Sequence, residues 1–148
     1  MPNTTTNYSL YKPLENDATD EDLWGGYLND SMDLIDAQMK KPYTVTAVTS
    51  SSNATTINLS LGYAFSHTFT ENTTFTFSNP LATGDNTGFK LFLTNDGTGR
   101  TPTWPASVIW TDGIEPDLNT ASEKNVLVFE TIDGGTTWYG ALAIGAAA

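Results

Sequence analysis

The sequence predicts a mainly β protein with an extended N-terminal arm, one short coiled-coil-like helix and a C-terminal antiparallel β-sandwich or jelly-roll-like domain. Residues 19–41 carry apolar side chains at helical spacing, whereas residues 42–148 alternate polar and apolar side chains in short runs between turn residues. Residues 1–18 follow neither period. We therefore expect an arm over residues 1–18, a helix over residues 19–41 and a β-domain over residues 42–148.

The composition bounds the classes of partner and chemistry. The chain has 148 residues, a net charge of -11 and no cysteine. Strong negative charge argues against nucleic acid or an anionic membrane as partner, and the lack of cysteine excludes disulfides, thiolate metal sites and a cysteine nucleophile. No apolar stretch is long enough to span a bilayer, and the polar start does not resemble a secretory signal. We therefore expect a protein made soluble in a cytoplasm.

The arm is polar but contains a few apolar side chains, which could adhere to a partner. These are Tyr8, Leu10, Tyr11 and Leu14. We expect an extended segment that becomes ordered on a docking partner, and a frayed terminus is the alternative.

The helix has one narrow apolar stripe. Its members are spaced by four, four, three and four residues, so they lie over one another on a helix: Trp24, Leu28, Met32, Ile35 and Met39. The last four have the spacing of a coiled-coil seam. Lysines at the end of the segment suit the negative end of the helix dipole, and Pro42 ends the helix.

This helix needs a partner. About 20 residues are only marginally helical in water, and Gly25 and Gly26 cost about 2 kcal/mol more relative to alanine. We predict that three copies of the helix associate through the stripe. An ordinary amphipathic helix lying on the following domain is the alternative.

The β-domain is expected to contain about eight short strands with turns at near-regular spacing, as in an antiparallel sandwich. The final pair is a hairpin around Asp133-Gly134-Gly135. The expected strands lie near residues 43–48, 57–61, 65–69, 75–77, 89–93, 108–110, 126–132 and 137–144.

Several motifs resemble segments of tailed-bacteriophage proteins. Trp24-Gly25-Gly26-Tyr27-Leu28-Asn29, continuing to Ile35-Asp36, and the earlier Leu10-Tyr11-Lys12-Pro13 resemble the front of many phage fibre and appendage proteins. The stretches at residues 104–110 and 133–140 are similar to the small β-domains of phage tail fibres and virion decorations. These motifs span residues 10–13, 24–36, 104–110 and 133–140, and the strand pattern between them agrees with the resemblance.

The resemblance implies a non-enzymatic homotrimer located in the virion. Each chain would bind two further copies of itself and other virion proteins of the tail, portal vertex or capsid. The arm would anchor the trimer to those proteins, and the β-domain would be displayed outward for host contact. The chain lacks the long shaft of fibres, so it would be a stub. A capsid decoration or cement protein (a head fibre) is the alternative.

No residue pattern predicts a catalytic, cofactor or metal site. His67 is the only histidine, and one histidine without cysteine cannot form a zinc site in one chain. It shares a strand face with Phe65 and Phe69, so we expect a core or interface histidine, and three copies meeting around an ion is the alternative. A small glycan-active enzyme would need a carboxylate pair, for which the closest cluster is Asp112, Glu115 and Asp117. That cluster lies among Gly and Pro and is predicted to be a solvated loop.

Two tryptophans differ in expected position. Trp138 alternates with Leu142 and Ile144 and is predicted to be core. Trp104 precedes Pro105 and is predicted at the surface, as a candidate contact for a host-surface glycan.

Overall fold

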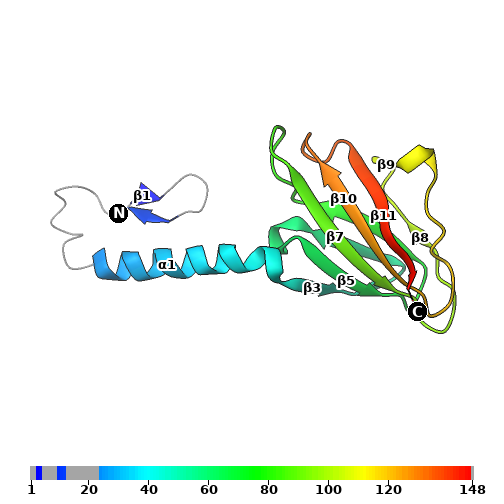
Figure 1. Ribbon diagram of the computed structural model, residues 1–148. Coiled ribbons are helices and arrows are strands. Elements are labelled where there is room, and N and C mark those ends of the chain that lie inside the picture. The colour runs from blue at the N-terminus through cyan, green and yellow to red at the C-terminus, as the bar shows by residue number, and fades with distance from the viewer. Residues whose placement is uncertain (1–2, 5–9, 13–23, 148) are drawn as a thin grey trace. The chain divides into compact units, whose positions relative to one another are not determined.

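The computed structural model describes residues 3–4, 10–12 and 24–147 and divides the chain after Pro42 into two compact units (Figure 1). The sequence places the boundary between helix and β-domain one residue earlier. Its boundary between arm and helix, at residues 18 and 19, lies outside the described residues.

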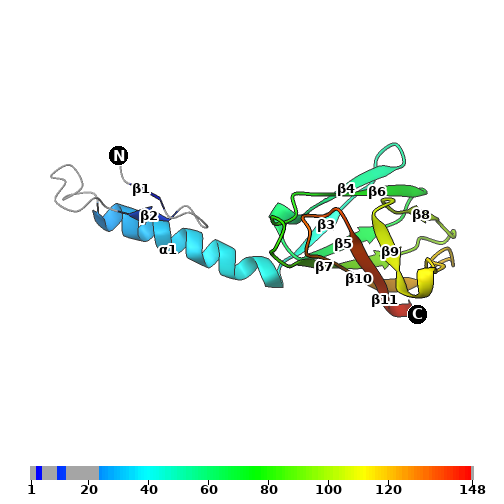
Figure 2. The same cartoon turned by 90° about the horizontal axis from the view of Figure 1, so that it is seen from above.

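The described residues of the first unit form one helix and a pair of very short strands. Strands β1 (Asn3–Thr4) and β2 (Tyr11–Lys12) pair antiparallel, which the sequence does not predict. Helix α1 spans Trp24–Lys40, and β2 contacts it (Figure 2). A 3-10 turn, Lys41–Tyr43, follows. The expected stop at Pro42 therefore agrees with the observed end of the helix to within two residues.

The second unit contains two β-sheets. The six-stranded sheet has the order β3-β5-β7-β10-β11-β9, and the three-stranded sheet has the order β4-β6-β8. The strands span Val45–Val48 (β3), Ala54–Asn58 (β4), Ala64–Thr68 (β5), Thr73–Ser78 (β6), Thr87–Thr94 (β7), Pro102–Thr103 (β8), Val108–Trp110 (β9), Lys124–Thr131 (β10) and Trp138–Ala147 (β11).

The chain winds between these sheets as a flattened coil. From β3 to β9, successive strands lie alternately in the six-stranded and the three-stranded sheet (Figure 2). A strand that returns to a sheet after crossing the other one runs in its original direction, so β3, β5 and β7 are parallel, as are β4, β6 and β8. The β10–β11 hairpin adds antiparallel pairs and is inserted between β7 and β9.

The mainly β class is confirmed, but the expected antiparallel pairing is wrong for most strands. Only β7, β10 and β11 pair antiparallel in the second unit; β9 pairs parallel with β11. Period-2 alternation shows which face of a strand is buried, but it does not reveal the direction of the neighbouring strand.

The core lies between the two sheets and is rich in aromatic rings. Phe89 and Phe129 stack with ring centroids 4.9 Å apart, and Phe75 and Trp104 stack at 4.8 Å. Such pairs contribute about 0.5–1.5 kcal/mol each beyond the area they bury. The other buried apolar residues are Ile57, Leu59, Phe65, Phe69, Leu91, Leu93, Leu118, Leu127 and Trp138.

In two strands, the predicted alternation of buried and exposed side chains stops earlier than expected. Strand β4 stops at Asn58, whose side chain accepts a hydrogen bond from the Ser60 backbone N–H at 3.1 Å and caps a 3-10 turn over Leu59–Leu61. In β11, Trp138 is core as predicted, but Leu142 and Ile144 are exposed. An irregularity in the pairing of β10 with β11 between these two residues breaks the alternation.

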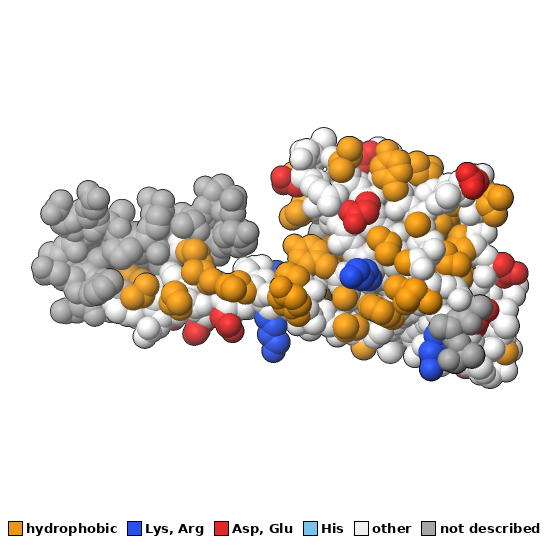
Figure 3. Space-filling view, viewed as in Figure 1, with side chains coloured by type: hydrophobic (Ala, Val, Ile, Leu, Met, Phe, Trp, Pro, Cys, Tyr) orange, Lys and Arg blue, Asp and Glu red, His pale blue; other side chains and the backbone are white. Residues whose placement is uncertain are grey.

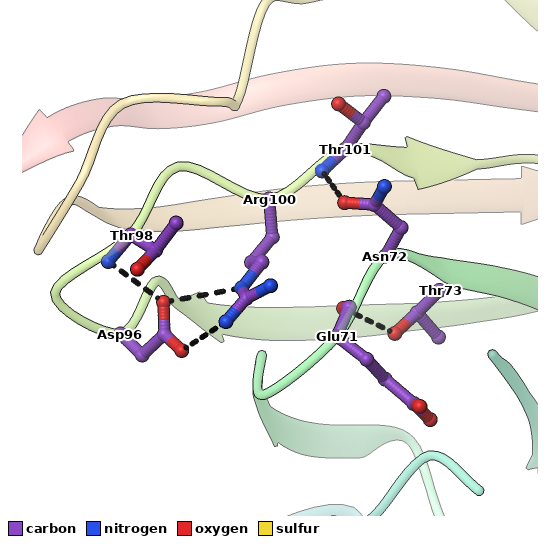
Figure 4. Close-up of polar contacts among 7 residues, drawn as sticks. All are labelled: Glu71, Asn72, Thr73, Asp96, Thr98, Arg100 and Thr101. Atoms are coloured by element: carbon purple, nitrogen blue, oxygen red, sulfur yellow. Dashed lines mark hydrogen bonds and ion pairs between the residues drawn. The ribbon is translucent and has the colours of Figure 1, made fainter. Parts of the chain in front are cut away.

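The loops at one end of the coil are joined by polar contacts (Figure 4). The Asp96 carboxylate accepts hydrogen bonds from Arg100 Nη2 at 3.0 Å and from the Thr98 backbone N–H at 2.9 Å, and the Arg100 bond is the main cause of its lowered pKa. The Asn72 side chain accepts from the Thr101 backbone N–H at 3.1 Å, which links the β5–β6 loop to the β7–β8 loop.

Asn95 is the buried counterpart of these loop contacts. Its side-chain amide donates to the carbonyl oxygens of Leu118 at 2.6 Å and Thr120 at 2.8 Å, so it attaches the loop before β10 to the end of β7. Replacing Asn95 by Ala should lower the free energy of unfolding by about 1–3 kcal/mol, because the buried bond to Leu118 and the part-buried bond to Thr120 are both lost.

Denaturant unfolding checks this expectation against Asn86→Ala, a matched change in an exposed loop. The control should stay within about 0.5 kcal/mol of the wild type. Equal stabilities of the two variants would contradict the assigned role of Asn95.

Candidate functional site

The apolar stripe of α1 is largely exposed. Leu28 is 49% exposed, Met32 56% and Met39 68%, and Ile35 is half-buried. The side chain of Trp24 lies outside what the structure describes. A single chain therefore leaves most of this predicted contact surface uncovered.

A different face of α1 is the less exposed one. Ser31 is buried, and Tyr27, Leu34 and Gln38 are half-buried. These positions repeat at helical spacing and lie beside the stripe, so the helix has one covered face and one exposed apolar edge. The sequence did not separate the two, because both contain large apolar residues.

The predicted docking residues fall mostly outside the described part of the chain. Leu10 is half-buried, and Tyr11 lies in β2 with only its backbone described. Tyr8 and Leu14 lie outside the described residues. Their role in docking stays a prediction.

The expected surface position of Trp104 is wrong. Its side chain is 8% exposed and stacks on Phe75, with Trp110 and Phe129 at its other sides. The ring therefore belongs to the core and cannot stack on a glycan. A following proline is typical of loops, but burial of the largest apolar side chain outweighs this local signal.

His67 is a core histidine of its own domain. It is 2% exposed, its Nδ1 lies 3.0 Å from the Val48 carbonyl oxygen, and Phe69 and Phe75 meet its ring edge-on. A carbonyl only accepts, so Nδ1 carries the proton. Burial lowers the pKa of His67, against smaller raising effects of the Val48 bond and Glu71. Three copies of this ring cannot meet around an ion while it is enclosed in this way.

The described residues contain no apparent chemical centre. No group of three or more His, Cys, Asp or Glu side chains among them is placed to hold a metal ion, and none of the described helices is long and apolar enough to cross a membrane. Asp112, Glu115 and Asp117 are all exposed, as predicted for a solvated loop. Surfaces are therefore the candidate functional features.

One surface was missed by the sequence reasoning. The outward side of the six-stranded sheet is largely apolar, and we call it the outer apolar face. Its exposed charged members are Lys90, Lys124 and Glu130, and its exposed apolar members include Val45, Phe92, Ile109, Tyr139, Ala141 and Ile144. Figure 3 shows hydrophobic side chains spread over this side of the β-domain. A hollow of about 330 Å³ beside β9 is lined by Ile109, Val128 and Tyr139, among others.

A sequence signal for this face exists. Phe92 lies between the buried Leu91 and Leu93, at a position of β7 where alternation would place a polar residue. Residues 126–129 are all apolar and do not alternate. Apolar residues in both phases indicate a strand covered on both faces. The prediction of a β-sandwich assumed a solvated outer side, so these outward apolar residues were not recognised as a surface.

Comparison with known proteins assigns no family. No family model matches the sequence, and no curated protein matches it. Indications of function therefore come from the surfaces of the molecule and from the motif resemblance.

The buried His67 predicts a pH dependence of stability. The folded-state pKa of His67 lies below the ordinary value near 6.5, so the ring is neutral in both states above pH 6.5 and stability is highest there. Stability is lost as the pH falls toward the folded-state pKa. Over this range the unfolded chain takes up a proton that the folded chain resists. Stability should therefore decrease as the pH falls below about 6.5.

Denaturant unfolding at several pH values measures this decrease. His67→Gln retains a side-chain N–H donor without a titrating ring, so its stability should vary less over the same range. A variant with the same slope as the wild type would assign the pH dependence to other groups.

Proposed function

We propose that the chain is a non-enzymatic structural protein of a tailed-phage particle, a short homotrimeric fibre-like appendage. In this proposal α1 forms a three-helix stem, the N-terminal arm docks on other virion proteins, and the β-domain is displayed for contact with the host surface. The observation that carries it is the exposed apolar edge of α1, at Leu28, Met32 and Met39.

The stem follows from the energetics of this edge. Full burial of a Leu or Met side chain contributes about 1.5–3 kcal/mol, and each helix of a trimer would bury several. A helix of 17 residues is marginal without such packing. The spacing of Leu28, Met32, Ile35 and Met39 is that of a coiled-coil seam, which supports association of helices over binding to a flat surface.

The arm and the phage context are supported by the resemblance of the Leu10-Tyr11-Lys12-Pro13 and Trp24-Gly25-Gly26 motifs to the front of phage appendage proteins. A trimer also gives the arm a mechanism. Three weakly binding arms held on one stem bind a symmetric site far more tightly than a single arm, because the second and third binding events become intramolecular.

The oligomeric state tests the stem. By sedimentation, the wild type should have three times the 16.0 kDa mass of one chain. Met32→Glu places a carboxylate in the seam of each helix, and uncompensated buried charge should dissociate the trimer at micromolar concentration. Ala37→Glu adds the same charge at an exposed position away from the stripe and should leave the mass unchanged.

A monomeric wild type would contradict the stem, as would a trimer that Met32→Glu leaves intact. Circular dichroism of each variant shows whether the β-domain stays folded.

The role in the particle is tested with virions that lack the protein. A fibre predicts reduced adsorption to host cells with an unchanged temperature of capsid failure. Earlier capsid failure on heating, with normal adsorption, would identify a decoration or cement protein instead.

A further inference from the structure

The two outward sheet faces of the β-domain differ sharply in chemistry. The three-stranded sheet presents Thr56, Thr74, Thr76 and Thr103 to solvent, and Thr56 and Thr76 hydrogen-bond to each other at 2.8 Å. The six-stranded sheet presents the outer apolar face. A solvated sheet face is normally polar, so the threonine face fits solvent and the apolar face fits a covering partner.

The outer apolar face is broad, and Lys90 is the one charged residue in its main row. One row of paired residues crosses five strands: Val45, Ala64, Lys90, Val128 and Ala141. With strands about 4.8 Å apart, such a row is roughly 19 Å long. A second row contains Phe92, which is 40% exposed, and Ile144, which is 54% exposed. Apolar patches of this extent on soluble proteins commonly mark contact surfaces.

One charged side chain of the face lies flat against the sheet. Glu130 pairs with Gly88 on the neighbouring strand, and its carboxylate occupies the space that a Cβ at Gly88 would fill. The absence of a side chain at Gly88 therefore lets Glu130 fold down. The face stays level enough for another surface to approach.

Charge favours a second copy as the occupant. Residues 41–148 carry nine acidic and four basic side chains, so two copies of the domain repel each other overall. Two of the four basic residues, Lys90 and Lys124, lie on the outer apolar face, against a single acid, Glu130. Repulsion is therefore weakest there, and Lys90 of one copy can pair with Glu130 of the next.

The connection to α1 favours the same occupant. Only residues 41–44 separate the end of α1 from β3, and four residues span at most about 14 Å. If three helices form one stem, each β-domain is held beside two others at an effective concentration near the millimolar range. At that effective concentration, a neighbouring β-domain of the same trimer is the partner that covers the apolar face first.

We propose that the outer apolar face is a contact surface between neighbouring β-domains of the trimer, so that the three domains form one body. The proposal rests on the helix stem proposed above. It adds a second interface, on the six-stranded sheet, and it leaves the threonine face directed to solvent.

Cysteine accessibility in the full chain tests this contact, because the chain has no cysteine of its own. Ala141→Cys places a thiol on the face, at the β11 end of the row, and Thr74→Cys places one on the exposed threonine face as a control. In the trimer, maleimide should label Cys at position 141 at least about tenfold more slowly than Cys at position 74, since a thiol is reactive only in the small fraction of open molecules. Adding Met32→Glu should bring the two rates together.

The outcomes separate the two proposals. A trimer in which both thiols react equally fast overturns the contact and leaves the stem intact. A monomeric wild type overturns both. Slow labelling that persists after the trimer dissociates would show that the domain itself buries position 141, and would also overturn the contact.

A second variant excludes an effect of the cysteine. Phe92→Glu adds a charge at an exposed position of the face and should speed labelling at position 141 at least about tenfold, since it weakens packing between domains without opening the core. Labelling that stays slow in a folded Phe92→Glu trimer would contradict the proposal.

Discussion

Phe89 and Phe129 stack across neighbouring strands of the six-stranded sheet, and Trp104 joins them from the segment between β8 and β9. Burial of these rings between two sheets is the constraint that the β-domain depends on. Every crossing of the chain from one sheet to the other places one side of a strand against this layer, and the coil, the parallel pairing and the enclosure of His67 follow from it.

The alternation of residues gave the strand positions and most of the core, because a period of two reports burial directly. It could not give strand direction, since parallel and antiparallel neighbours bury the same residues. The insertion of β10 and β11 between β7 and β9 was equally hidden, because it joins segments distant in sequence. Trp104 shows the limit of local signals: the adjacent Pro105 indicates a loop, but the ring packs into the core.

The candidate surfaces were predictable to different degrees. The stripe on α1 was visible as spacing in the sequence, and its exposure needed the structure. The outer apolar face had a signal in Phe92 and in the apolar run at residues 126–129, but that signal has meaning only once both sides of the sheet are known. A surface of this kind is defined by pairing across strands, which no single segment contains.

The pairing of β9 has a consequence for how the chain is made. Among the strands that the structure describes, β9 pairs only with β11, which ends at Ala147. During synthesis the strands that precede β9 can pair as they emerge, but β9 stays unpaired until Trp138, Tyr139 and Gly140 have left the ribosome. Completion of the sheet is therefore a late event that joins segments distant in sequence. Until then the partly folded domain has an unpaired strand beside an apolar core that has already begun to form.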